Sequence, residues 1–300
     1  MVKTVLSVKN LSKKINEKII IHRLNFRVQS GEIYGFLGPN GSGKTTTIRM
    51  ITGLIKPSAG HVTICGHDIQ LEPKKALANI GAIIENPELY PYMTGKQNLD
   101  NFARMYPKKI SQKQIRRMIS LVNLSDAIHQ PVKNYSLGMK QRLGIAQALL
   151  HQPKVLILDE PTNGLDPVGI RDLRLYLKKL AHQNDIAIIV SSHLLSEIEL
   201  MCDRVLIIDH GKFITEKDLS SYQTNNSRQY TFKVSNTTHI SNFFSATTIS
   251  DINHFTINCS EEHIPEVIKK LVQSNIDIFS ITQQKTSLEE DFINMTRGEK

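Results

Sequence analysis

The sequence lacks long apolar runs, a recognisable leader and paired cysteines. Its longest apolar runs, such as residues 155–158 and 186–190 of 300, are far shorter than the roughly 20 residues that a membrane helix needs. The first five residues have neither the apolar core nor the cleavage site of a signal peptide. Cys65, Cys202 and Cys259 are odd in number and irregularly spaced, which argues against a disulfide framework or a cysteine-based zinc site. We therefore expect a cytosolic chain.

The composition is that of a globular protein, and the positive charge is concentrated in residues 1–214. Hydrophobic residues make up 40% and charged residues 22% of the chain, which argues against wholesale disorder. The net charge is +9, but residues 215–300 hold 8 basic and 11 acidic side chains, which leaves 29 basic and 17 acidic ones in residues 1–214. A basic domain suggests a nucleotide, a nucleic acid or an anionic membrane as partner. A solvated basic surface without a partner is the alternative.

The hydrophobic pattern predicts a large α/β domain followed by a small α+β appendage. Short β-strands are expected near the N-terminus, and strand-like and helix-like segments then alternate. Three apolar runs, residues 33–37, 155–158 and 186–190, are typical of buried parallel strands. Ligands bind at the carboxyl ends of such strands, so we expect these three ends to converge.

The composition changes after Gly211. Residues 215–227 are polar and rich in serine, which predicts a linker between a domain at residues 1–214 and a smaller one at 228–300. Three strands and two helices are expected in the smaller domain. The strands fall at residues 230–234, 255–257 and 276–281, and the helices at 264–271 and 288–295.

Residues 38–45 match the phosphate-binding pattern G-x-x-x-x-G-K-[ST], between a strand and a helix that carries Ile48 and Ile51. The glycines let backbone N–H groups turn toward phosphates, and the helix N-terminus adds its dipole. Lys44 is expected to reach the β- and γ-phosphates of ATP, and Thr45 to bind Mg²⁺. A glycine-rich turn without a ligand is the alternative that the complete motif disfavours. The residues predicted to bind the nucleotide here are Gly38, Pro39, Asn40, Gly41, Ser42, Gly43, Lys44, Thr45 and Thr46.

Two acids and a histidine follow the other two buried strands. Residues 155–158 run into Asp159 and Glu160, and residues 186–190 run into Ser191-Ser192-His193. Beside a phosphate loop, Asp159 is predicted to hold Mg²⁺ and Glu160 to orient or deprotonate the attacking water. We favour a catalytic His193 at the γ-phosphate over a structural histidine.

Residues 135–141, Tyr-Ser-Leu-Gly-Met-Lys-Gln, resemble the L-S-G-G-Q signature of the ATP-binding subunits of ABC (ATP-binding cassette) transporters. Residues 162–166 resemble the D-loop of that family. The resemblance covers about residues 2–214 and implies an α/β P-loop ATPase cassette. Such a cassette has a parallel-sheet core, an N-terminal antiparallel β subdomain and a helical subdomain. It also implies that Ser136 and Gly138 contact the γ-phosphate of ATP held by a second copy.

Three positions differ from the family pattern. Leu137 stands in place of the first signature glycine, and Ile15 aligns with the aromatic residue that stacks on adenine. Glu85 replaces the glutamine of the Q-loop, so three carboxylates are expected near one Mg²⁺. The alternative is that Glu85 points into solvent and that the exchange is neutral. With the C-terminal appendage, Glu85 and the signature narrow the resemblance to subunits of bacitracin and lantibiotic immunity transporters.

The resemblance implies an ATP hydrolase that uses ATP and Mg²⁺, forms a homodimer and powers a separate membrane-spanning permease. It places the chain at the cytoplasmic face of the cell membrane, and residues 86–106 are expected to contact the permease. The alternatives are a soluble ABC protein that acts on nucleic acid or the ribosome, and an ATP sensor without turnover. One phosphate loop, one signature and no long coiled coil disfavour a nucleic-acid partner, and the complete set of Asp159, Glu160 and His193 disfavours a sensor.

Overall fold

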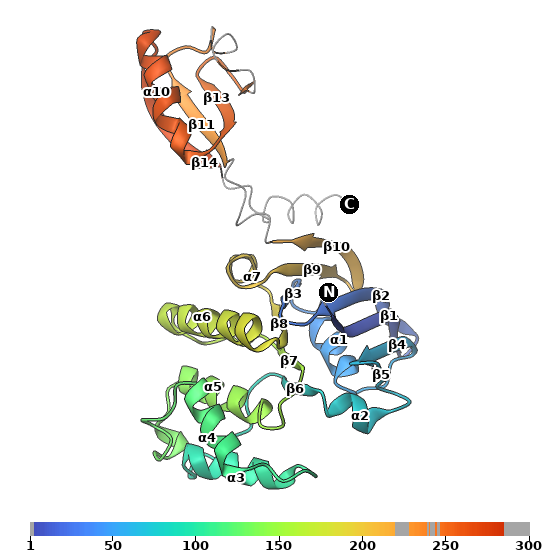
Figure 1. Cartoon of the computed structure of the whole chain (residues 1–300). Coiled ribbons are helices and arrows are strands. Elements are labelled where there is room, and N and C mark those ends of the chain that lie inside the picture. The colour runs from blue at the N-terminus through green and yellow to red at the C-terminus, as the bar shows by residue number, and fades with distance from the viewer. Residues whose placement is uncertain (1–2, 220–227, 239, 241–243, 245–246, 285–300) are drawn as a thin grey trace. The chain divides into compact units, whose positions relative to one another are not determined.

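The computed structural model describes residues 3–219, 228–238, 240, 244 and 247–284 (Figure 1). The chain forms two compact units, Met1–Leu219 and Ser220–Lys300. The terminal helix expected at residues 288–295 lies outside the described residues.

The larger unit is built on a ten-stranded mixed sheet in the order β5-β4-β1-β2-β10-β9-β3-β8-β7-β6. Strands β6, β7, β8, β3 and β9 run parallel, whereas β1, β2, β4 and β5 pair antiparallel. The predicted parallel core and antiparallel N-terminal part are therefore correct. The strands are β1 (Thr4–Ile15), β2 (Lys18–Gln29), β3 (Ile33–Leu37), β4 (Ala59–Ile64), β5 (His67–Asp68), β6 (Ile80–Ile83), β7 (Val155–Leu158), β8 (Ala187–Ser192), β9 (Arg204–Asp209) and β10 (Lys212–Asp218).

Helices cover both faces of the parallel strands, with α6 and α7 on one face and α1 on the other (Figure 1). Side chains of α1 and of the antiparallel strands share one buried core with β3, β7 and β8. Helices α3, α4 and α5 form a separate helical part next to β6. The helices are α1 (Lys44–Ile51), α2 (Pro73–Leu77), α3 (Gly95–Met105), α4 (Gln112–Leu121), α5 (Leu137–Ala148), α6 (Pro167–Asn184) and α7 (Leu195–Met201), with a 3₁₀ turn at Val132–Asn134.

Side-chain caps start several of these helices. Thr94 and Gln97 form a reciprocal capping box at α3, and Ser136 caps α5 by accepting a hydrogen bond from the Met139 N–H. Asp166 caps α6 by accepting from the Gly169 N–H. Such caps satisfy N–H groups that the first helical turn leaves free. A side-chain cap therefore fixes a helix start within the signature segment, at Ser136, and at the end of the D-loop segment, at Asp166.

Residues 215–218, predicted as linker, belong to β10. They pair antiparallel with β9, with Thr215 opposite Ile207 and Asp218 opposite Arg204. The prediction was wrong here because polar composition suggested a loop, whereas backbone hydrogen bonds hold the segment in the sheet. The larger unit continues to Leu219, which is buried.

The smaller unit contains a four-stranded antiparallel sheet in the order β12-β13-β11-β14. Helix α10 contributes Val267 and Leu271 to a core with Phe232 and Phe255, whose rings stack 5.0 Å apart. The predicted α+β composition is present, although β12 was not foreseen. The elements are β11 (Arg228–Val234), β12 (Thr247–Ile249), β13 (His254–Cys259), a 3₁₀ turn (Glu261–His263), α10 (Ile264–Gln273) and β14 (Ile278–Gln284).

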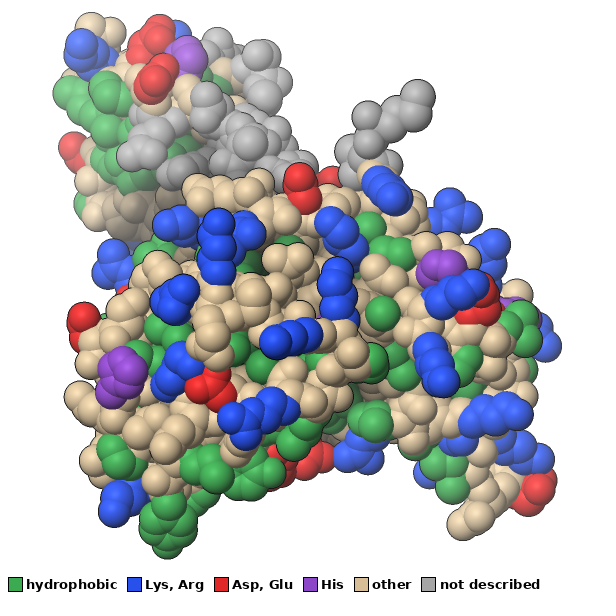
Figure 2. Space-filling model, turned by 60° about the horizontal axis from the view of Figure 1, so that its bottom comes forward, with side chains coloured by type: hydrophobic (Ala, Val, Ile, Leu, Met, Phe, Trp, Pro, Cys, Tyr) green, Lys and Arg blue, Asp and Glu red, His purple; other side chains and the backbone are tan. Residues whose placement is uncertain are grey.

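The basic excess of the larger unit lies on its surface. Figure 2, which brings the end with α3 and α4 forward, shows Lys and Arg side chains spread over this face and few acidic ones. Among the residues that the structure describes, no helix is long and apolar enough to cross a bilayer.

Candidate active site

The loop between β3 and α1 requires glycine at its turning points. Gly41 and Gly43 have φ angles of 80° and 104°, in the left-handed region that other residues avoid. A Cβ on Gly43 would lie 2.4 Å from Cδ1 of Ile21, and one on Gly38 would lie 2.3 Å from the carbonyl oxygen of Ile208. A side chain at Gly43 would therefore clash with Ile21, and one at Gly38 would clash with the backbone of β9.

Two buried polar groups of this loop fit a phosphate ligand. Lys44 is 6% exposed, and its Nζ donates to the carbonyl oxygens of Gly38 and Pro39 at 2.7 and 3.3 Å. Among the described residues the buried Ser42 hydroxyl has no hydrogen-bond partner, which is costly unless a ligand supplies one. Phosphate oxygens accept from N–H, O–H and ammonium donors alike, so the loop fits a nucleotide phosphate.

Asp159 is held at the end of β7 by a residue of the neighbouring strand. It is 3% exposed, and its Oδ1 accepts a 2.6 Å hydrogen bond from the Ser191 hydroxyl. The same hydroxyl oxygen accepts from the Glu160 N–H at 2.8 Å. Ser191 thus orients both acids, a role that the sequence did not reveal because it depends on the pairing of β7 with β8.

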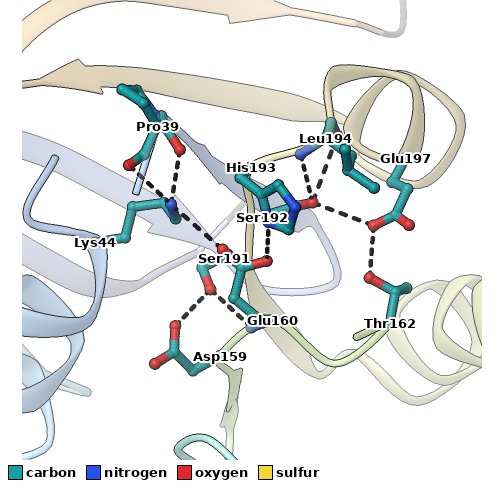
Figure 3. Close-up of polar contacts among 11 residues, drawn as sticks. Pro39, Lys44, Asp159, Glu160, Thr162, Ser191, Ser192, His193, Leu194 and Glu197 are labelled. Atoms are coloured by element: carbon teal, nitrogen blue, oxygen red, sulfur yellow. Dashed lines mark hydrogen bonds and ion pairs between the residues drawn. The ribbon is translucent and has the colours of Figure 1, made fainter. Parts of the chain in front are cut away.

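The carboxylate of Glu160 lies between Lys44 and His193 (Figure 3). Its Oε1 is 3.3 Å from the Lys44 Nζ, and its Oε2 is 2.9 Å from the His193 Nδ1. Glu160 also has a φ of 47°, a strained conformation of the kind that functional sites retain. The three strand ends therefore converge as predicted, and they bring Lys44, Glu160 and His193 together.

Next to these residues lies the carboxylate of Glu197, which sequence reasoning missed. Oε2 of Glu197, on α7, accepts from the Thr162 hydroxyl at 2.5 Å and from the Ser192 hydroxyl at 3.1 Å (Figure 3). Thr162 follows the acidic strand and Ser192 ends β8. These bonds fix the segment after Glu160 against the strand that carries His193.

A cavity of about 270 Å³ opens beside the phosphate loop. Ile20 and Asn163, the second residue of the D-loop segment, line it, although sequence reasoning had placed neither among the nucleotide-binding residues. Ile15, expected near the adenine, is not among its lining residues and is 46% exposed. The lining residues are Ile20, Asn40, Gly41, Gly43, Lys44, Thr45, Thr46, Glu160, Asn163 and His193.

Glu85 does not join this group. Its Oε1 lies 2.7 Å from the Arg49 Nη2, and the side chain is 66% exposed. The expected cluster of three carboxylates is therefore reduced to Asp159 and Glu160, because the guanidinium of Arg49 on α1 offers Glu85 an opposite charge. The Glu85–Arg49 pair instead links the segment after β6 to the helix of the phosphate loop.

The signature residues begin α5 but do not line the cavity of their own chain. Ser136 and Gly138 are absent from the described residues around the phosphate loop. A Cβ on Gly138 would meet only Cδ2 of Leu165 at 3.8 Å and Oγ of Ser136 at 4.0 Å. The start of α5 therefore lies outside the cavity of its own phosphate loop, with open space at Gly138.

Residues 21–163 match the family model described as ABC transporter. The chain is 50% identical to the uncharacterized ABC transporter ATP-binding protein YhcH of Bacillus subtilis, over 98% of this chain and 96% of that protein. It is 39% identical to the bacitracin transport ATP-binding protein BcrA of Bacillus licheniformis, over 98% of each chain. A lantibiotic transport ATP-binding protein, SrtF of Streptococcus pyogenes, is 39% identical over 71% of this chain and 91% of its own.

Solved structures of ABC transporter ATP-binding subunits share the fold of the larger part of this chain. A dimeric ATP-binding cassette in a post-hydrolysis state bound to ADP and phosphate has a TM-score of 0.62 and 26% identity, over 71% of this chain and 98% of its own. The cbiO1 subunit of a Clostridium perfringens ABC transporter complex has a TM-score of 0.68 and 27% identity, over 74% and 92%. The expected α/β ATPase cassette is confirmed.

Proposed function

The chain belongs to the ATP-binding proteins of ABC transporters, and from this premise we propose that it powers the removal of antimicrobial peptides of the bacitracin and lantibiotic type. It binds ATP and is an ATP hydrolase. The main support for a peptide substrate is the match to BcrA. This match extends over 98% of both chains and so includes the smaller unit. The match to SrtF supports the same substrate class through the larger unit.

The site supports a hydrolysis mechanism in which each residue has one task. Lys44 and the Ser42 hydroxyl bind phosphate oxygens, in place of the loop carbonyls that Lys44 contacts now. Glu160 accepts the proton of the attacking water, and His193 orients the Glu160 carboxylate through their contact. Thr45 and Asp159 would hold Mg²⁺, which when bound neutralises charge on the phosphate oxygens.

We place the second half of each site on another copy of the chain. Ser136 and Gly138 lie at the N-terminus of α5, where free N–H groups and the helix dipole favour an anion. Neither residue lines the cavity beside the phosphate loop of its own chain. A head-to-tail homodimer therefore supplies two complete sites, and the dimeric cassette among the similar structures supports this arrangement.

The permease is proposed to dock in a cavity of about 450 Å³ between β6 and α5. Two buried acceptors that have no hydrogen-bond partner in the described part of the chain belong to its lining residues: Oε1 of Gln147 and Nδ1 of His151. The His151 Nε2–H donates a hydrogen bond to the carbonyl oxygen of Ile80 at 2.8 Å. Burial lowers the pKa of His151, so the ring is neutral and its Nδ1 is an acceptor. A docking segment that is apolar but carries a hydrogen-bond donor fits this cavity. We propose that such a contact holds the chain at the cytoplasmic face of the membrane.

Tyr92, 84% exposed on the segment that enters α3, is proposed to contact the same permease. We expect Tyr92→Ala to weaken copurification with the permease roughly tenfold, the loss typical of a tyrosine that carries much of the binding energy of an interface, and to leave ATP binding unchanged. Phe213→Ala, which removes another exposed aromatic ring, is the control and should copurify normally. Equal recovery of both variants would contradict this placement.

The peptide substrate is tested in cells that carry the chain and its permease. We expect deletion of this gene to lower the concentrations of bacitracin or a lantibiotic that stop growth. A plasmid copy should restore resistance, and a Lys44→Ala copy should not, because Lys44 binds the phosphates that drive transport. Unchanged sensitivity to both peptide classes would reject this substrate, although the ATPase assignment would stand.

A further inference from the structure

A cavity of about 630 Å³ lies between α4, α5 and α6, in the size range of small-molecule sites. No described residue that lines it also lines the cavity of the phosphate loop or the proposed permease cavity. It is therefore a separate site, and none of the motifs in the sequence accounts for it. The residues that carry the argument are Arg117, Arg142, Asp172, Leu175, Tyr176 and Lys179.

The side chains that line this cavity carry more positive than negative charge. Arg117, Arg142 and Lys179 line it, and Asp172 is its single acid. The Arg142 Nη2 lies 3.2 Å from Oδ2 of Asp172, so this pair is neutral overall. In the described part of the chain, Arg117 and Lys179 have no ion-pair partner, and these two positive charges are left for an anion.

Tyr176 adds a donor that lacks an acceptor. Its hydroxyl is buried without a hydrogen-bond partner among the described residues. Burial raises the pKa of Tyr176, so the phenol keeps its proton and is available as a hydrogen-bond donor. A buried donor without an acceptor is costly, and an anion oxygen would remove that cost.

We propose that this cavity binds a phosphate monoester. Its dianion matches the two unpaired positive charges, and its three terminal oxygens can accept from Arg117, Lys179 and Tyr176 together. The Leu175 side chain at the cavity wall offers apolar surface for the organic group. The monoester comes either from a soluble metabolite or from the headgroup of phosphatidic acid. A bound ligand joins α4 of the helical part to α6, the helix that follows the D-loop.

The test uses the full chain with its nucleotide site saturated by Mg-ADP, so that the phosphate loop does not bind the probe. Calorimetry with glycerol 3-phosphate measures the soluble source. Sedimentation with phosphatidylcholine vesicles containing phosphatidic acid measures the lipid source, and vesicles with phosphatidylglycerol, a diester, are their control. Binding in either arm supports the proposal and names the source.

Matched variants separate the cavity from the general surface charge. We expect Arg117→Gln and Tyr176→Phe each to weaken binding roughly tenfold, the effect of one hydrogen bond to a charged group. Arg116→Gln removes the same charge from the neighbouring residue, which is exposed like Arg117 but does not line the cavity. It should change binding by less than about twofold. The proposal is overturned if neither probe binds, if the diester vesicles bind equally, or if Arg116→Gln and Arg117→Gln behave alike.

Discussion

Replacing Glu160 with glutamine is expected to slow ATP hydrolysis by about 100- to 10,000-fold, the contribution of a well-placed general base. The amide keeps the size of the side chain and an oxygen that can accept from Lys44, which lies 3.3 Å from Oε1. It loses the negative charge and the ability to take a proton from water. ATP binding should persist, because Ser42 and Lys44 bind the phosphates without Glu160.

The measurement is phosphate release at steady state, together with equilibrium binding of ATP. Glu197→Gln is the matched control, since it makes the same chemical change in a carboxylate that contacts Thr162 and Ser192 but not Lys44. We expect that variant to lose less than about tenfold, because a neutral amide oxygen can still accept both hydroxyl bonds. Glu160→Gln at the wild-type rate would show that another residue is the base.

The parts of the site that depend on neighbouring residues in sequence could be predicted. The phosphate loop is eight consecutive residues between a strand and a helix, so its glycines and Lys44 were readable without coordinates. Two of the three converging strands could be predicted from the apolar runs that precede Asp159 and His193. Their closeness follows from the rule that parallel strands present their carboxyl ends at one edge.

The parts that depend on contacts across the sheet could not be predicted. Ser191 binds Asp159 only because β8 lies beside β7. Glu85 was expected at the metal from a one-residue difference in a motif, but its partner is Arg49, 36 positions earlier. Composition likewise could not show that residues 215–218 remain in β10, because hydrogen bonds of the backbone are insensitive to side-chain polarity.

Gly138→Asp is expected to abolish most ATP hydrolysis, by roughly 100-fold or more, without harming the monomer. Within one chain a Cβ at this position meets nothing closer than 3.8 Å. A side chain there therefore fits, and the change in folding stability should stay within about 0.5 kcal/mol. Any large loss of activity must then arise from something outside the monomer.

The expected cause is the phosphate of the ATP held by the second copy. An aspartate at the start of α5 puts a negative charge where the helix N-terminus and the Gly138 N–H would otherwise stabilise an anion. ATP should still bind to the phosphate loop of each monomer. In a Glu160→Gln background, sedimentation with Mg-ATP should show dimers, and adding Gly138→Asp should return the protein to monomers.

Asn134→Asp provides the control, because it adds the same charge at an exposed position four residues earlier. It should dimerise and hydrolyse ATP nearly as the wild type does, which separates the position of the charge from its presence. A Gly138→Asp protein that dimerises with ATP and retains its activity would place the signature outside the site. A monomeric Glu160→Gln protein at saturating Mg-ATP, alone and with the permease, would instead reject the homodimer, because two copies are needed to bring Gly138 to a phosphate loop.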